Sequence, residues 1–331
     1  MSLCRIAVSV AWVIGLWTGL SSACMADASA GYPSRPVQLV VPFAAGGSSD
    51  ALMRLLSQIV SKEWKQPIIV DNRPGASGAI AGEYVARQPA DGYTLMNVGP
   101  TSLTALSALR RDLPYDPMKD LVVASLLQII PNLLVVNPTK VDVQNVRGLI
   151  DYAKANPGKL SYASTGLGST GHLAVELFKM LTGTDLVHIT YRGNGPALND
   201  LLAGTVDLTI DGISSVGGQA KEGRLRAIGV TTAKRISSLP DVPTVSETVP
   251  NFEAQTWNGL AVRNGTPPEI IEKISRDYNR ALRQPEVVRW LTNLQTEPVG
   301  SSPAEARSFT EADQARWARV VRELKLDVNQ K

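Results

Sequence analysis

Apolar residues in this chain follow two patterns. Some form short continuous runs, and others recur every three or four positions. Val37 to Val41 is a β-branched apolar run typical of a strand buried on both faces, and Pro42 ends it. Helical spacing follows in the residues Ala51, Leu52, Leu55, Leu56 and Ile59. The opening segment therefore predicts a strand, a glycine-rich turn and a helix.

The segment between this strand and helix, Ala44 to Ser49, has the features of a small anion site. A helix leaves its first backbone N–H groups unpaired, and glycine lets a ligand approach the backbone. The partial positive charge of the helix start adds to the hydroxyls of Ser48 and Ser49, so a carboxylate could bind without Lys or Arg. The alternative is a plain connection in which Ser48 or Ser49 caps the helix and Asp50 complements its dipole.

The same unit recurs twice before residue 110. One predicted strand, 67–72, leads through the turn Arg73 to Gly78 into a helix over 79–86. Another, 94–98, leads through the turn Gly99 to Ser102 into a helix over 103–109. This alternation predicts a parallel sheet, and ligands of such sheets lie beyond the carboxyl ends of the strands. We therefore expect the three turns to surround one site.

The second half of the chain repeats this design. Its predicted strands are 159–164, 186–191, 206–210 and 225–231, and its predicted helices are 143–155, 172–181 and 196–202. A strand over 257–262 and three helices, 270–282, 285–293 and 303–324, complete the chain. The apolar stretch 121–136, broken by Pro131, and the segment 251–257 are interpreted as two crossings between domains, which predicts a hinge. Trp257 lies beside the second crossing, so we expect its environment to change on closure.

The N-terminus has a different pattern. Arg5 precedes an apolar run over 6–20 and then small residues over 23–30, which predicts a secretory signal peptide over residues 1–26, with cleavage after Ala28 or Ala30 as alternatives. Both cysteines, Cys4 and Cys24, would leave with it, so the mature chain would contain no disulfide. Lipidation of Cys24 is a further alternative, because Leu20 to Cys24 resembles a lipobox with its Leu one residue early.

Composition limits the partners of the chain. The 331 residues are 44% hydrophobic and 19% charged, which is ordinary for a globular protein of two domains. The formal net charge is +3, and the Lys and Arg residues are scattered along the sequence. Neither nucleic acid nor an acidic membrane surface is therefore an implied partner.

Enzymatic chemistry finds little support in the motifs. Gly166 to Gly171 reads G-x-G-x-x-G, but the following strand ends at Tyr191-Arg192 without the acidic residue that binds the ribose of a dinucleotide. Only His172 and His188 offer imidazole bases, no G-x-S-x-G elbow occurs, and their spacing matches no common metal site. His188 lies within a strand, where a core role is expected. For His172 two roles remain, a contact to the ligand or a packing or helix-end role. We expect no enzyme activity, no metal and no cofactor.

Many short motifs in one order match a known family. The chain resembles the Bug, or TctC-like, extracytoplasmic solute receptors of tripartite tricarboxylate transporters over nearly all of its length after the leader. The motifs are Tyr32 to Pro36, Pro42 to Asp50, Asp71 to Ala76, Asp91 to Leu95, Leu113 to Asp116, Ser164 to Ser169, Tyr191 to Gly193 and Leu239 to Thr244.

The resemblance implies an α/β fold, a two-lobed type II periplasmic binding protein with a hinge of two crossovers. Residues 31–130 and 253–331 would form lobe 1, and residues 131–252 would form lobe 2. In this family two glycine and hydroxyl turns bind a carboxylate, partly through ordered waters. By position these are a first turn, with Ala45, Gly46, Gly47, Ser48, Ser49 and Asp50, and a second turn over Ser164 to His172, with Ser164, Thr165, Gly168, Ser169, Thr170 and His172. Weaker candidates at neighbouring strand ends are Ser77, Thr101, Ser102, Arg192 and Asp211.

Two functions remain open from the sequence. A periplasmic, monomeric receptor would deliver a small mono-, di- or tricarboxylate to the membrane permease subunits of a tripartite tricarboxylate-type transporter. A ligand-sensing co-receptor would present the same solute to a membrane sensor kinase. Genes encoded alongside would distinguish a permease from a sensor kinase.

Overall fold

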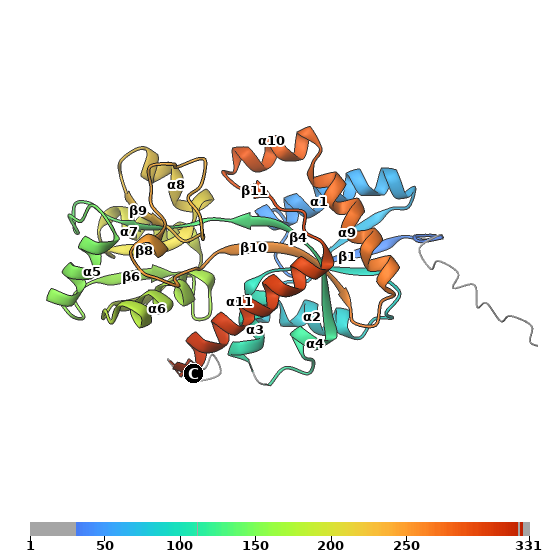
Figure 1. The fold of residues 1–331 in the computed structure, drawn as a ribbon, viewed down its shortest axis with the longest axis horizontal. Coiled ribbons are helices and arrows are strands. Elements are labelled where there is room, and N and C mark those ends of the chain that lie inside the picture. The colour runs from blue at the N-terminus through green and yellow to red at the C-terminus, as the bar shows by residue number, and fades with distance from the viewer. Residues whose placement is uncertain (1–30, 111, 324, 327–331) are drawn as a thin grey trace, which may run out of the picture.

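The computed structural model describes residues 31–110, 112–323 and 325–326, which form two mixed β-sheets with helices on both faces of each (Figure 1). The expected signal peptide and Cys24 lie outside these residues. Within the described residues, no helix combines the length and the apolar character needed to cross a membrane.

The first sheet has six strands in the order β11-β4-β10-β3-β1-β2. Three of them are parallel, β1 (Val37–Val41), β2 (Ile68–Asn72) and β3 (Thr94–Val98). The other three, β4 (Leu121–Ile130), β10 (Thr256–Arg263) and β11 (Glu297–Pro298), pair antiparallel. The parallel pairing predicted from the strand-turn-helix units is confirmed for β1, β2 and β3, and β10 adds an antiparallel strand between β3 and β4.

Helices cover this sheet on two faces, each with its own core. One core joins the sheet to α1 (Ser48–Trp64), α9 (Pro268–Leu282) and α10 (Pro285–Asn293). The other face carries α2 (Ala79–Ala86), α4 (Pro117–Asp120) and α11 (Pro303–Glu323). Leu39 lies in the first core and its neighbour Val40 in the second, as the alternation of a strand buried on both faces requires. Short 3₁₀ turns, η1 (Ala76–Gly78) and η2 (Pro100–Ser102), follow β2 and β3 and precede α2 and α3 (Thr104–Leu109).

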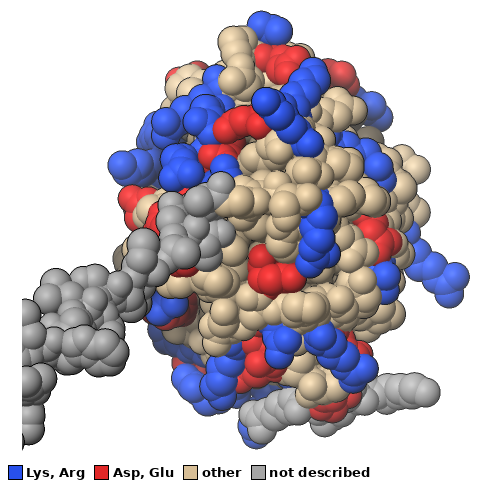
Figure 2. Space-filling view, turned by 90° about the vertical axis from the view of Figure 1, so that its right-hand side faces the viewer, with Lys and Arg blue, Asp and Glu red and all other residues tan. Residues whose placement is uncertain are grey.

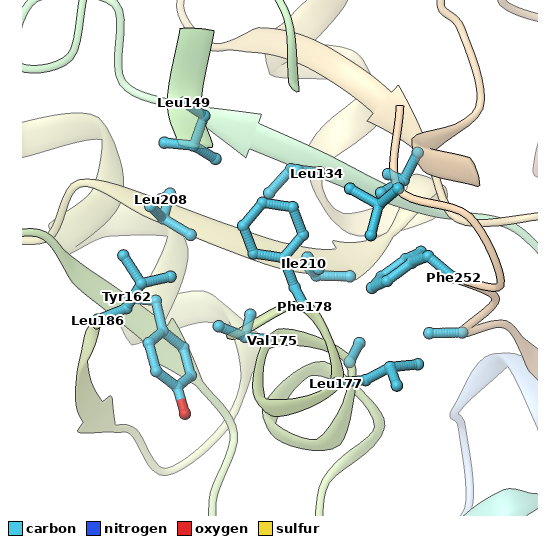
Figure 3. Close-up of a cluster of buried hydrophobic side chains, with 14 of the residues drawn as sticks. Leu134, Leu149, Tyr162, Val175, Leu177, Phe178, Leu186, Leu208, Ile210 and Phe252 are labelled. Carbon is cyan, nitrogen blue, oxygen red and sulfur yellow. The ribbon is translucent and has the colours of Figure 1, made fainter. Parts of the chain in front are cut away.

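The second sheet has the order β7-β6-β8-β5-β9. Its strands are β5 (Asn132–Val136), β6 (Ser161–Ser164), β7 (Val187–Thr190), β8 (Leu208–Gly212) and β9 (Arg226–Val230). One face packs against α5 (Val146–Ala155) and α6 (Thr170–Thr182), where Figure 3 shows Phe178 beside Leu134, Ile210 and Phe252. The other face packs against α7 (Asn194–Ala203) and α8 (Ile213–Lys221). A further 3₁₀ turn, η3 (Val245–Glu247), follows β9.

The two sheets adjoin at Pro131. Ile130, the last residue of β4, pairs with Thr256 of β10, and Asn132, the first residue of β5, pairs with Gly212 of β8. Asn132 also donates from Nδ2 to the Ala254 carbonyl at 3.0 Å, which joins the two crossings to each other. The parallel strands of both sheets therefore end at this junction, with their carboxyl ends facing it.

The C-terminal helix provides a third connection between the sheets. Figure 1 shows α11 extending from beside β10 toward α6. Its residues Trp317, Val320 and Val321 belong to the same buried cluster as Leu134 of β5. The lobe boundaries expected from the sequence stay a prediction, but the last turns of α11 pack into the core of the second lobe.

A candidate anion site between two turns

The first turn leaves three backbone N–H groups unpaired. α1 begins at Ser48, and Gly47 precedes it with extended backbone (φ −73°, ψ 165°) and no side-chain cap. Within the described part of the chain, the amides of Ser48, Ser49 and Asp50 donate to no partner. Serine capping was therefore a wrong alternative, because both serines lie inside the helix. The start of α1 offers its donors and its dipole to whatever faces it.

Asp50 shapes this turn. The residue is only 3% exposed, and its carboxylate accepts from the Gly46 amide at 2.9 Å, Asn72 Nδ2 at 2.9 Å and Arg54 Nε at 3.0 Å. Burial alone would raise the pKa of Asp50, but these hydrogen bonds together lower it below its ordinary value. With its oxygens occupied, Asp50 holds Gly46 in place, and Ala45, Gly46, Gly47 and Ser48 remain exposed.

The neighbouring turns of the first sheet lie against each other. A Cβ added at Gly78 would come within 2.5 Å of Ser102 Cβ, so η1 and η2 approach closely there. Ser102 is buried, and its hydroxyl accepts from the Gly99 amide at 3.0 Å, which occupies it inside its own turn. Thr101 is half-buried and Ser77 is exposed, and neither side chain has a hydrogen-bond partner among the described residues. Only these two of the three residues are free to contact a ligand.

A polar network that was not predicted from the sequence extends from the first turn across the sheet. Ser49 Oγ donates to Asn258 Oδ1 at 3.1 Å, and Asn97 Nδ2 approaches the same oxygen at 3.4 Å. Asn258 Nδ2 in turn donates to Gln128 Oε1 at 3.2 Å, and Gln128 Nε2 donates to Thr296 Oγ1 at 2.7 Å. The signal available in the sequence was three amide side chains within otherwise apolar strands.

The second turn, like the first, leads into a helix whose first amides are unpaired, but a side chain caps this helix. Ser169 caps α6 by accepting from the His172 amide at 3.3 Å. The amides of Thr170 and Gly171 have no partner in the part of the chain that the structure describes. Thr165 is exposed, and the hydroxyls of Thr165 and Thr170 have no partner among the described residues. The start of α6 therefore offers two free amides and two hydroxyls near the junction.

Both histidines lie directly behind this turn. His172 is 3% exposed, and its Nδ1 accepts from the Gly168 amide at 3.1 Å. His188 Nε2 lies 2.6 Å from Ser164 Oγ, which also accepts from the Gly166 amide at 3.1 Å. Burial, and then the adjacent His188, lower the pKa of His172 to about 4. His188 therefore has more than the core role expected from its strand.

Two further candidates follow β7 and β8. Asp211 accepts from the Gly212 amide at 2.7 Å, Ser215 Oγ at 2.9 Å and Asn194 Nδ2 at 3.3 Å, and burial raises its pKa. These bonds occupy its carboxylate within the second lobe. Arg192 is exposed and forms no ion pair or hydrogen bond with any described residue. Arg192 is thus a free cation beside the second turn.

Two cavities lie elsewhere on the described part of the chain. One, of about 680 Å³, lies between α3, α4 and α11, and another, of about 390 Å³, lies at the hinge beside Pro131 and Gln255. Neither is lined by a residue of the first or second turn. Figure 2 shows Lys and Arg interspersed with Asp and Glu on the face of the first lobe. Among the described residues, no group of three or more His, Cys, Asp or Glu could bind a metal ion.

Comparison with known proteins identifies relatives along nearly the whole chain. Residues 52–326 match the family model described as the tripartite tricarboxylate transporter family receptor, TctC. Protein BugT of Bordetella pertussis is 37% identical over 316 residues, which is 94% of this chain and 96% of that protein.

Solved structures agree with this relationship. A Rhodopseudomonas palustris protein, Rpa4515 with adipate, is 38% identical with a TM-score of 0.74, covering 88% of this chain and 97% of its own. MatC from the same organism with bound malate is 32% identical with a TM-score of 0.72, and the match covers 88% of this chain and 100% of MatC. The predicted two-lobed α/β fold is confirmed.

Proposed function

Because the chain belongs to the family of tripartite tricarboxylate transporter receptors, we propose that it is a periplasmic solute-binding protein. It binds a small carboxylate between its first and second turns and delivers this ligand to the membrane permease of such a transporter. This family consists of solute-binding receptors rather than enzymes. Its members are periplasmic, and the proposal places this chain in the same compartment.

The observation that carries the proposal is the pair of unpaired helix starts. α1 and α6 begin with free amides at Ser48 to Asp50 and at Thr170 to Gly171, and both follow strands that end at the junction. Each start combines directed N–H donors with the positive end of a helix dipole, which suits an anion. Two such starts on two lobes match a ligand with a carboxylate that both lobes can reach.

The candidate residues divide into two roles under this proposal. Direct contacts come from groups that are free in the described structure. These are the unpaired amides of Ser48 to Asp50, Thr170 and Gly171, the exposed backbone at Ala45 and Gly47, and the side chains of Ser77, Thr101, Thr165, Thr170 and Arg192. Groups that are already occupied shape the turns, namely the amides of Gly46 and Gly168 and the side chains of Ser49, Asp50, Ser102, Ser164, Ser169, His172 and Asp211.

Relatives suggest which carboxylate to try first. Rpa4515 and MatC, named with adipate and malate, support a linear dicarboxylate as the ligand of this chain. With helix starts on both lobes and Arg192 beside one of them, the site can receive two carboxylates of one ligand.

A thermal-shift titration tests carboxylate binding. Adipate and malate are compared with adipamide, which has the length of adipate but no charge. At one hundred times its dissociation constant a ligand adds about 2.7 kcal/mol to the free energy of unfolding, so a binding acid raises the Tm measurably. Stabilisation by adipamide equal to that by adipate, or by neutral sugars alone, would contradict the proposal.

Delivery needs a separate test in cells. Uptake of a labelled acid that binds in vitro is compared between cells with and without the gene. Loss of uptake that returns on complementation supports delivery to a permease. Unchanged uptake, together with an altered transcriptional response to the acid, would favour the sensor-kinase alternative.

A further inference from the structure

Three aromatic rings form a stack behind the second turn. His172 of α6 stacks on His188 of β7 with ring centroids 4.4 Å apart, and His188 stacks on Tyr162 of β6 at 4.7 Å. Each histidine also bonds to the turn itself, His172 to the Gly168 amide and His188 to the Ser164 hydroxyl. The stack thus connects the sheet to both ends of the loop that leads into α6.

The hydrogen bond to Gly168 fixes the protonation of His172. An amide N–H donates, so Nδ1 must present its lone pair, and the proton of the neutral ring lies on Nε2. A protonated ring would place an N–H at Nδ1 against the N–H of Gly168, and the bond would be lost. Gly168 has φ +76°, a conformation that this bond helps to maintain.

The groups around His172 come from three elements. His188 faces it from β7, with Tyr162 of β6 behind, and Glu176 and Lys179 lie along α6. Glu176 accepts from the Tyr162 hydroxyl at 2.7 Å and from Lys179 Nζ at 2.8 Å, so its charge is compensated. Burial, His188 and Lys179 disfavour a charged His172, and only Glu176 favours it. The neutral ring is therefore the state that this environment selects.

We propose that His172 and His188 are positioning residues for ligand capture, which hold the second turn so that the Thr170 and Gly171 amides face the ligand only while His172 is neutral. This inference rests on the proposed function for its ligand. The stacked histidine pair controls the shape of the turn, and protonation of His172 in acid breaks its bond to Gly168.

Nitrogen NMR of the ligand-free protein tests the geometry independently of any ligand. The ring nitrogens of His172 should show the Nε2–H form, with a coupling across the hydrogen bond between Nδ1 and the Gly168 nitrogen. The Gly168 amide signal should shift as His172 titrates near pH 4. An Nδ1–H form, or a Gly168 amide that is insensitive to the titration, would overturn the proposal.

Two substitutions separate positioning from packing. In His172→Asn the side-chain oxygen takes the place of Nδ1 and accepts from Gly168, whereas His172→Leu keeps bulk and removes the acceptor. With adipate as the probe at pH 7, calorimetry should show at least tenfold weaker binding in His172→Leu and binding within about threefold of wild type in His172→Asn. Below about pH 5 the affinity of the wild type should fall more steeply than that of His172→Asn, since protonation of adipate is common to both.

Tyr162→Phe is the matched control, because it keeps the ring stack and removes only the hydroxyl that bonds to Glu176. Its affinity should equal that of wild type. Equal weakening in the Asn and Leu variants, or none in His172→Leu, would overturn the proposal. If adipate does not bind the wild type, that choice of ligand fails, and the nitrogen spectra still decide whether His172 positions the turn.

Discussion

The hydroxyl of Ser49 donates to Oδ1 of Asn258 at 3.1 Å, although the two residues lie more than 200 positions apart. This bond joins the first turn of α1 to the strand that begins at the second crossing. Asn258 continues the connection to Gln128 in β4, which ends at the first crossing. The orientation of the first turn is therefore coupled to both crossings through a single buried side chain.

Replacing Asn258 by Leu should destabilise the protein by about 1 to 3 kcal/mol, because Gln128 Oε1 and the Ser49 hydroxyl lose their partner. Urea denaturation measures the change. Ser49→Ala is the matched control, and it should cost about 1 kcal/mol or less, since Asn258 keeps its bonds to Asn97 and Gln128. Equal stability of Asn258→Leu and wild type would show that the network is dispensable.

Asp50→Asn should destabilise the fold by about 1 to 3 kcal/mol at pH 7, because its amide NH₂ would face the donors from Gly46, Arg54 and Asn72. The folded pKa of Asp50 is lowered, so its contribution is present above the unfolded value of about 4 and is lost as pH falls below it. Urea denaturation from pH 7 to pH 3 should show the two proteins converging in acid. Arg54→Met, which leaves the other two donors, should cost less. A constant difference at all pH values would be inconsistent with a stabilising carboxylate.

His172 should make the fold less stable in mild acid. Its folded pKa of about 4 lies below the ordinary 6.5, so the unfolded chain takes up the proton first and stability falls between these values. The complete titration of this one group lowers the free energy of unfolding by roughly 3 kcal/mol. Urea denaturation at several pH values should show a steeper decline in wild type than in His172→Asn. Parallel curves for the two proteins would mean that His172 titrates normally when folded.

Trp257 should not report ligand binding, contrary to what its place beside the crossing suggests in the sequence. It is 1% exposed, donates from Nε1 to Asp313 at 3.0 Å and meets Phe309 edge-on at 5.8 Å. All three residues fall within the predicted first lobe, and Trp257 and Phe309 pack in one buried cluster, so closure would move them together. Emission assigned to Trp257, taken as the difference between wild type and Trp257→Phe, should be the same with and without bound acid. A ligand-dependent shift in that difference would mean that α11 moves relative to β10.

The sequence predicted the strand-turn-helix units well because each is encoded locally. Apolar runs give buried strands, and glycine followed by helical spacing gives the turns. It did not predict α8, whose segment Ile213–Lys221 contains two glycines and follows β8 directly. That helix is stabilised by burial of Ile213 and Val216 against the sheet, a tertiary effect that overrides weak propensity.

The site was predicted less completely than the fold. Sequence indicates which turns carry donors, but not which donors are already occupied by neighbours. Asp50 and His172 are of residue types expected at an anion site. In the structure, however, both side chains accept hydrogen bonds from backbone amides of their own turns. Asn258 could not be assigned because its partners Ser49 and Gln128 are distant in the chain.

The central claim is that backbone amides at the starts of α1 and α6 bind the carboxylate, and proline at the first helical position tests it most directly. Proline there keeps the helix but removes the N–H, and Gly47 and Ser169 already have the extended backbone that a following proline requires. Calorimetry with the acid that best stabilises the wild type compares Ser48→Pro with Ser48→Ala, and Thr170→Pro with Thr170→Ala. Each proline variant should bind at least tenfold more weakly than its alanine partner, since a hydrogen bond to a charged group contributes about 1.5 to 3 kcal/mol. Proline variants that bind as tightly as their alanine partners, while folded, would contradict the account.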